Sequence, residues 1–188
     1  VDRSLTAYST AVLDVQEDGL RLTWNLTLEF RRSQHEVFQV QLPTDYLLEK
    51  VAGTNVRGWE IEAGDESQTV EVSLLKAAKE SEQFTLHLWR NGPVGSGELS
   101  RFDAPVVRVT AAALHGGRIT IRRSPMLDVR TEKVSGATRA DIGTAPAVTN
   151  QAEKEPGAGT EESPLGIRPY QAYQFASTAY TIGLAASP

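Results

Sequence analysis

The chain of 188 residues lacks cysteine altogether, has a single methionine, and contains no long apolar run. Without cysteine, disulfides, catalytic thiols, iron–sulfur clusters and thiolate zinc sites are excluded. No apolar stretch approaches the about 20 residues of a membrane-spanning helix, and the first residues do not form a signal peptide. We therefore expect no membrane insertion by this segment. Because the chain starts without methionine, we expect it to be part of a larger protein, with any signal or anchor outside it.

Basic residues are fewer than acidic ones. Lys and Arg number 19 against 24 for Asp and Glu, which gives a net charge of −5. An acidic chain repels phosphates, so a nucleic-acid partner is not expected. The basic residues that gather in the second half have the spacing of a solvated strand face. They are Arg118, Arg122, Arg123, Arg130, Lys133 and Arg139.

What the sequence does contain is alternation. Between Leu20 and Phe30 every second residue is apolar, and the residues between them are polar. Successive side chains of a strand point to opposite faces, so this period predicts a strand with one dry face and one wet face. The predicted core positions are Leu20, Leu22, Trp24, Leu26, Leu28 and Phe30.

Similar patterns predict strands along most of the chain. The strand over Leu5–Gln16 and the turn at Glu17-Asp18-Gly19 should form an antiparallel hairpin with the strand from Leu20. The other expected strands are Val37–Leu42, a short one around Trp59 and Ile61, Val70–Leu74, Phe84–Leu88, Val106–Ala113, Ile119–Arg122 and Met126–Val134.

Several segments should interrupt these strands. Leu47–Val56 is irregular with a bend at Gly53, Lys76–Ser81 could form one helical turn, and Asn91–Ser100 is a glycine-rich loop. His115-Gly116-Gly117 is expected to be a tight hairpin corner.

The expected fold is all-β, either an antiparallel β-sandwich or a broad curved sheet. Residues 1–142 should form the body. Residues 143–166 contain almost nothing large and apolar, which predicts a flexible linker. Residues 167–188 are rich in tyrosine and aliphatic residues. They should form one or two terminal strands that dock back on the body or open a next module.

The order of these features carries a resemblance. The hairpin is followed by Phe38-Gln39-Val40-Gln41-Leu42-Pro43, then Trp59-Glu60-Ile61-Glu62, then Val70-Glu71-Val72, then Phe84-Thr85-Leu86-His87-Leu88. This order resembles β-rich modules of large uncharacterised bacterial envelope proteins. More distantly, it is similar to the saddle-shaped N-terminal domain of zinc aminopeptidases. The resemblance covers about Leu5–Arg90 and implies a β-sandwich with an accessory role.

Two motifs come close to known catalytic signatures and miss them. His35-Glu36-Val37-Phe38-Gln39 has Gln where a zinc-protease helix needs its second His, and it runs into a strand. Gly92–Gly97 resembles a phosphate loop, but Glu98 stands where such a loop needs Lys. We predict a mobile hairpin loop there.

No other catalytic or metal site is predicted. The three histidines, His35, His87 and His115, fall in three different predicted elements, and His115 is expected to be a turn residue. The acid pairs Asp65 with Glu66 and Glu60 with Glu62 have no regular oxygen-ligand loop and are expected to be solvated. We expect no catalytic residue, no metal and no cofactor.

One candidate binding face remains. It consists of Gln83, Thr85, His87 and Trp89, which lie opposite the core positions of their strand. An exposed Trp beside amides and hydroxyls can stack a sugar ring, whereas a second layer of structure over Trp89 would bury it.

The sequence therefore predicts a non-catalytic structural or protein-interaction module of a larger extracytoplasmic bacterial protein, in the periplasm or at the cell surface. Its partners would be other domains of the parent protein or envelope proteins. The alternative is a carbohydrate-binding module with a glycan ligand at the Trp89 face.

Overall fold

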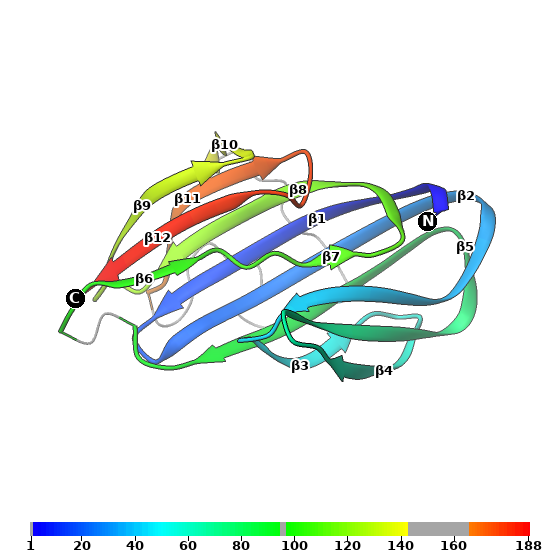
Figure 1. The fold of residues 1–188 in the computed structure, drawn as a ribbon, viewed down its shortest axis with the longest axis horizontal. Coiled ribbons are helices and arrows are strands. Elements are labelled where there is room, and N and C mark those ends of the chain that lie inside the picture. The colour runs from blue at the N-terminus through cyan, green and yellow to red at the C-terminus, as the bar shows by residue number, and fades with distance from the viewer. Residues whose placement is uncertain (1, 95–96, 143–165) are drawn as a thin grey trace.

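The computed structural model describes residues 2–94, 97–142 and 166–188, and its long regular elements are β-strands arranged in two sheets (Figure 1). The predicted all-β class is confirmed. The predicted linker lies almost wholly outside the described residues. The strands are β1 (Asp2–Gln16), β2 (Gly19–Pro43), β3 (Leu47–Ala52), β4 (Val56–Ala63), β5 (Ser67–Asn91), β6 (Ser100–Asp103), β7 (Arg108–Val109), β8 (Ala112–Arg123), β9 (Asp128–Ser135), β10 (Ala137–Ala140), β11 (Arg168–Phe175) and β12 (Thr181–Ser187).

The hairpin of β1 and β2 is the centre of the large sheet, whose strand order is β10-β11-β8-β1-β2-β5-β3 with β4 and β7 on side pairings. The predicted hairpin is confirmed, with Ala11 opposite Trp24 and Leu13 opposite Leu22. The predicted dry face is also confirmed, because all six apolar positions between Leu20 and Phe30 are buried. Alternation in the sequence therefore located the core face of this strand.

Strands β2 and β5 are much longer than the sequence predicted. Each spans 25 residues, so the separate strands expected on either side of Arg31–Glu36 and of Lys76–Ser81 are single continuous ones. The two strands pair along their whole length and bend together, so that the second half of β2 folds back over the sheet (Figure 1). Phe38 in the returning half thereby faces Phe84, with ring centroids 6.1 Å apart. The bend makes one curled sheet enclose its own core.

The helical turn predicted over Lys76–Ser81 is wrong. This segment is the bend in β5, where Glu80 takes a φ of 72° and the pairing with β2 changes register between Glu29 and Gln34. A polar segment without alternation carries no strand signal of its own. Here it connects two halves of β5 that both pair with β2. Bulges on both strands supply the curvature.

The corner predicted at His115-Gly116-Gly117 is also wrong, because β8 runs straight through it. Strand β8 pairs with β1 in parallel, with Ser9 opposite Gly117, so the sheet is mixed rather than antiparallel throughout. A Cβ at Gly117 would meet the backbone nitrogen of Ser9 at 2.9 Å and its Cβ at 2.8 Å. Glycine is needed here for close approach of two strands, not for a turn.

The C-terminal segment docks on the body, as predicted. Strand β11 pairs with the edge of β8 that faces away from β1 in the large sheet, and β12 lies between β6 and β9 in the small sheet. Tyr180, between these strands, packs its ring against Phe175 with centroids 4.5 Å apart and donates a hydrogen bond to the Pro105 carbonyl at 2.8 Å. The segment therefore completes the core instead of covering the Trp89 face.

Strands β3 and β4 lie end to end along the edge of β5 that β2 leaves free. They follow the same bend as β2, with Gly53 and Asn55 in the connection, and Asn55 Nδ2 donates to the Lys76 carbonyl at 2.9 Å. Across the described ranges of the chain, β5 is the strand that pairs with β4, so the opposite side of β4 is an open edge of the sheet.

Candidate functional site

The predicted sugar-binding face is only partly open. Thr85 is buried, and its hydroxyl accepts a hydrogen bond from Asn25 Nδ2 at 3.0 Å. Gln83 is exposed and donates from its Nε2 to Asn25 Oδ1 at 3.2 Å. His87 and Trp89 are half-buried. The sheet thus brings all four predicted residues to one face, where Asn25 engages two of them.

Trp89 is covered on one side by a cation. The guanidinium of Arg21, directly opposite on β2, lies 4.8 Å from the ring centroid of Trp89, which is the geometry of a cation–π contact. A sugar stacking on that side of the ring would have to displace Arg21. Carbohydrate binding at this face stays a prediction.

A separate polar cluster lies inside the core, and the sequence pattern did not predict it. Ser9 on β1 and His115 on β8 face each other, with Ser9 Oγ 2.6 Å from His115 Nε2. Trp24 Nε1 donates to the same Ser9 hydroxyl at 2.8 Å, and the backbone N–H of Val109 donates to His115 Nδ1 at 3.4 Å. All three side chains are buried.

This serine–histidine contact joins two strands of the core. Because Nδ1 of His115 accepts the Val109 N–H, we assign the ring proton to Nε2, which donates to Ser9 Oγ. A catalytic base needs Nε2 free to take the serine proton. Burial, with the cation of Arg108 adding to it, lowers the pKa of His115 to about 4, so the ring stays neutral. The Ser9–His115 pair holds β1 to β8.

The basic residues predicted to form a solvated face are in part structural. Arg122 makes two hydrogen bonds to Asp14 on β1, of 2.5 and 2.6 Å, with both side chains largely buried. Arg118 is buried and donates to the backbone carbonyl of Asp141. These two cations are therefore engaged within the protein.

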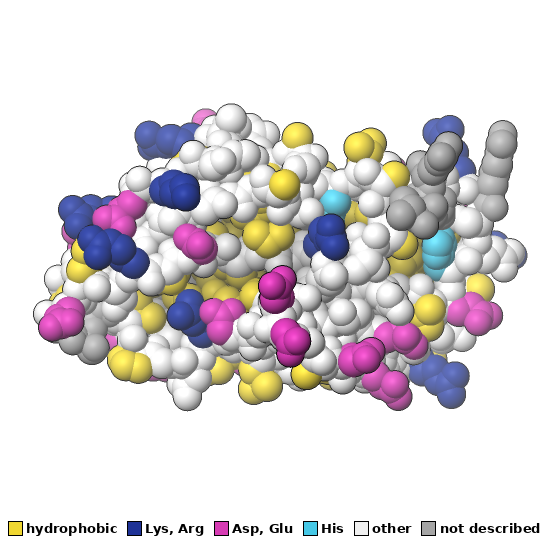
Figure 2. Space-filling view, viewed as in Figure 1, with side chains coloured by type: hydrophobic (Ala, Val, Ile, Leu, Met, Phe, Trp, Pro, Cys, Tyr) yellow, Lys and Arg dark blue, Asp and Glu magenta, His cyan; other side chains and the backbone are white. Residues whose placement is uncertain are grey.

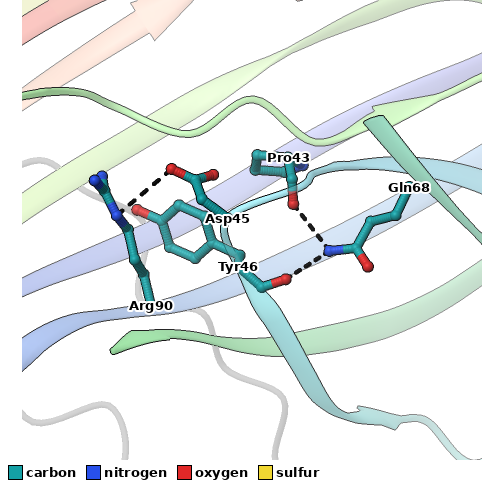
Figure 3. A network of polar contacts seen from close by, with 5 residues as sticks. All are labelled: Pro43, Asp45, Tyr46, Gln68 and Arg90. Atoms are coloured by element: carbon teal, nitrogen blue, oxygen red, sulfur yellow. Dashed lines mark hydrogen bonds and ion pairs between the residues drawn. The ribbon is translucent and has the colours of Figure 1, made fainter. Parts of the chain in front are cut away.

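The front of the molecule has a hollow of about 690 Å³ where the returning half of β2 meets β6 and the segment that leads to β7. Its floor is the turn after β2, shown in Figure 3. Gln68 Nε2 donates to the carbonyls of Pro43 at 2.9 Å and Tyr46 at 2.5 Å, which fixes this turn. Asp45 and Arg90 form an ion pair of 3.5 Å beside it.

Tyr46 is buried beneath that ion pair. Burial raises the pKa of its hydroxyl, the charge of Asp45 adds to the rise, and Arg90 acts in the opposite direction. The hydroxyl therefore stays protonated. The side chains around the hollow are of both charges and include no nucleophile paired with a base among the described residues. The hollow offers polar contacts from side chains of both charges.

The open edge at β4 exposes apolar side chains. Trp59 pairs with Val72 and Ile61 with Val70, and both valines are fully buried. On the other side of β5, these valines pair with Phe38 and Val40, which are also buried. Two apolar rows thus run from the core to the edge, where Trp59 and Ile61 are 37% and 43% exposed.

The opposite face of the same strand is acidic. Glu60 lies directly opposite Glu71 on β5, and Glu62 follows one pleat further on, all three exposed. Asp65 and Glu66 are exposed in and beside the next turn. Figure 2 shows acidic side chains in a row over the part of the face where Figure 1 places β4 and the start of β5.

The sequence showed the alternation of Trp59-Glu60-Ile61-Glu62 and predicted a short strand from it. What it could not show is that, among the residues that the structure describes, this strand has a paired neighbour on one side only. The acid pairs at Glu60 with Glu62 and at Asp65 with Glu66 are exposed, as predicted. Groups of three or more potential metal ligands are not found in the described parts of the chain.

His35 lies at the bend of β2, where its ring stacks on Phe38 with centroids 5.0 Å apart. His35 and Gln39 belong to one strand and not to a helix, as the sequence predicted. Within the described residues, no helix is long and apolar enough to cross a membrane.

Comparison with known proteins finds likeness in structure but not in sequence. No family model matches the chain, and no curated protein sequence matches it significantly. The chain is similar to the M1 zinc metallopeptidase of Deinococcus radiodurans, with a TM-score of 0.48 and 11% identity, over 99% of this chain and 42% of that one. A substrate-bound E323A mutant of that enzyme has a TM-score of 0.48 and 12% identity, over 98% of this chain and 43% of that one.

The chain thus spans less than half the length of these structures. They are zinc metallopeptidases, the kind of enzyme whose N-terminal domain the strand order distantly resembles. The resemblance to envelope-protein modules stays a prediction.

Proposed function

We propose that this chain is a non-catalytic structural or protein-interaction module of a larger extracytoplasmic bacterial protein. The observation that supports this best is the open edge at β4, where two apolar rows of the core end in half-exposed Trp59 and Ile61. A sheet edge with unpaired backbone groups and an apolar face is a ready surface for another chain. The burial of the Ser9–His115 pair in the core agrees with a role outside catalysis.

Site-specific crosslinking in the full-length parent protein tests this. A photoreactive residue at position 61 should crosslink to a polypeptide, either another domain of the parent or a separate envelope protein. The matched control is position 75, because Leu75 is also exposed and apolar but lies on β5. The crosslinked polypeptide, once identified and purified, should bind the chain in solution.

Two outcomes contradict the proposal. Equal crosslinking at positions 61 and 75 would mean that β4 is not a specific contact. Binding on a glycan array that is lost in Trp89→Ala and unchanged in Ile61→Thr would favour the carbohydrate-binding alternative. The extracytoplasmic location is tested separately by cell fractionation with an antibody to the chain.

A further inference from the structure

We propose that the free edge of β4 binds a basic, extended segment of a partner protein by strand addition. This inference rests on the proposed interaction function and names the partner's chemistry and binding mode. The partner segment would alternate apolar residues with Lys or Arg. It would add one strand to the large sheet beyond Trp59 and Ile61.

The apolar half of this pattern follows from the register. The row of Val40, Val70 and Ile61 and the row of Phe38, Val72 and Trp59 are each built from residues directly opposite one another. In each row the members on β2 and β5 are fully or nearly fully buried, while the member on β4 is open. A further strand with apolar side chains at the facing positions would continue both rows and remove the remaining apolar surface from water.

The Lys or Arg positions of the partner segment follow from the acidic face of β4. Glu60 and Glu71 are directly opposite each other, and like charges in that position destabilise a strand pair. Lys or Arg on an added strand would fall beside Glu60 and Glu62 and offset this repulsion. Arg57 is the cation on β4 itself and lies at its start, so the attraction is strongest at the end near Asp65 and Glu66.

The same charges argue against a second copy of this chain as the occupant. Edge-to-edge pairing of two β4 strands would bring the acidic side chains of both copies onto one face of the joined sheet. A basic segment meets no such repulsion.

The experiment uses the whole chain and synthetic peptides of about nine residues, which is within the usual range of strand lengths. One peptide alternates lysine and valine, a second alternates glutamate and valine, and a third has the lysines and valines in two blocks. Affinity is measured by calorimetry, and hydrogen exchange of the β4 amides is followed by NMR. The alternating basic peptide should bind and should slow exchange at β4 amides that do not bond to β5.

The other peptides and variants give the controls. The acidic peptide and the block peptide should each bind at least about tenfold more weakly, because one loses the charge match and the other the register. Glu60→Gln with Glu62→Gln should weaken binding of the basic peptide severalfold. Asp18→Asn with Glu98→Gln removes two exposed acids elsewhere and should leave binding unchanged.

Ile61→Lys places a charge on the apolar face of the edge and should abolish protection of the β4 amides. Since Ile61 is already half-exposed, this variant should keep its fold, which circular dichroism checks. Equal binding of block and alternating peptides, protection elsewhere than β4, or no binding would overturn strand addition. A crosslink at position 61 without peptide binding would leave the proposed interaction function standing. A concentration-dependent dimer through β4 would replace the basic partner with a second copy.

Discussion

The centre of the sheet and its β4 edge carry the same alternation but differ in what surrounds them. Leu26 on β2 lies between β1 and β5 and is fully buried, whereas Ile61 on β4 has β5 on one side and is 43% exposed. Both side chains occupy core-facing positions of their strands. The comparison teaches that alternation selects the face of a strand, while burial depends on having neighbours on both sides.

The polar residues of the two regions differ in the same way. At the centre, Ser9, His115 and Trp24 satisfy one another in a dry environment, and Asp14 is paired with Arg122. At the edge, Glu60 and Glu71 face each other with like charge. The centre is therefore arranged for stability, and the edge keeps unsatisfied surface and charge.

The largest effect is expected from truncating the centre. Leu26→Ala removes a fully buried side chain and should lower the free energy of unfolding by about 2–5 kcal/mol. Ile61→Ala at the edge should cost about 1 kcal/mol or less, since it loses little buried surface. Urea unfolding measures both. Thr27→Ala, on the opposite face of β2, should cost little, and equal losses in all three variants would contradict the difference between centre and edge.

Acid should weaken the centre through His115. Its pKa is about 4 in the folded protein and about 6.5 when unfolded, so the unfolded state takes up the proton first as pH falls. The stability due to the neutral ring is complete above pH about 6.5 and is lost between about 6.5 and 4. At about 1.36 kcal/mol per pKa unit, the difference between 6.5 and about 4 corresponds to a loss on the order of 3 kcal/mol.

Urea unfolding of the wild type and of His115→Asn, across that pH range, checks this. The variant has no ring to titrate, so the difference in stability between the two proteins should shrink as the pH falls. A difference that is constant from pH about 7 to 4 would show that His115 titrates alike in both states.

Substitution by alanine should have opposite effects on stability at Gly117 in the centre of the sheet and at Gly58 on its edge. Gly117→Ala puts a Cβ against the backbone of Ser9 and should cost about 1–3 kcal/mol, because the parallel strands must move apart. Gly58→Ala at the edge meets open space and should stabilise the protein by about 0.5–1 kcal/mol. Thermal and urea unfolding distinguish these opposite signs, and a neutral Gly117→Ala would mean that β1 and β8 approach less closely.

The smallest expected effect lies at the edge itself. Glu60→Gln removes the repulsion with Glu71 and should raise the free energy of unfolding by about 0.2–1 kcal/mol. Because the pair is exposed, the gain should fade at high salt. A loss of stability instead would indicate that Glu60 makes a favourable contact in solution.

Three local features of the fold could be predicted from the sequence. The alternation over Leu20–Phe30, the hairpin turn at Asp18-Gly19 and the apolar C-terminal segment each rest on local side-chain order, and each prediction was confirmed. The sequence alone also excluded a zinc-protease motif and a phosphate loop, because Gln39 and Glu98 stand where these motifs need His and Lys.

Only the tertiary structure decided what lies beside each strand. The sequence suggested a turn at His115-Gly116-Gly117 and a helical turn at Lys76–Ser81. Parallel pairing with Ser9 keeps the first extended, and continuous pairing with β2 keeps the second extended around a bend. Likewise, Trp59 and Ile61 follow the same alternation as the core strands, and their exposure arises because no described strand pairs with β4 beyond β5. Alternation is a property of one segment, whereas pairing joins segments distant in sequence, so only the folded chain determines which edges stay open.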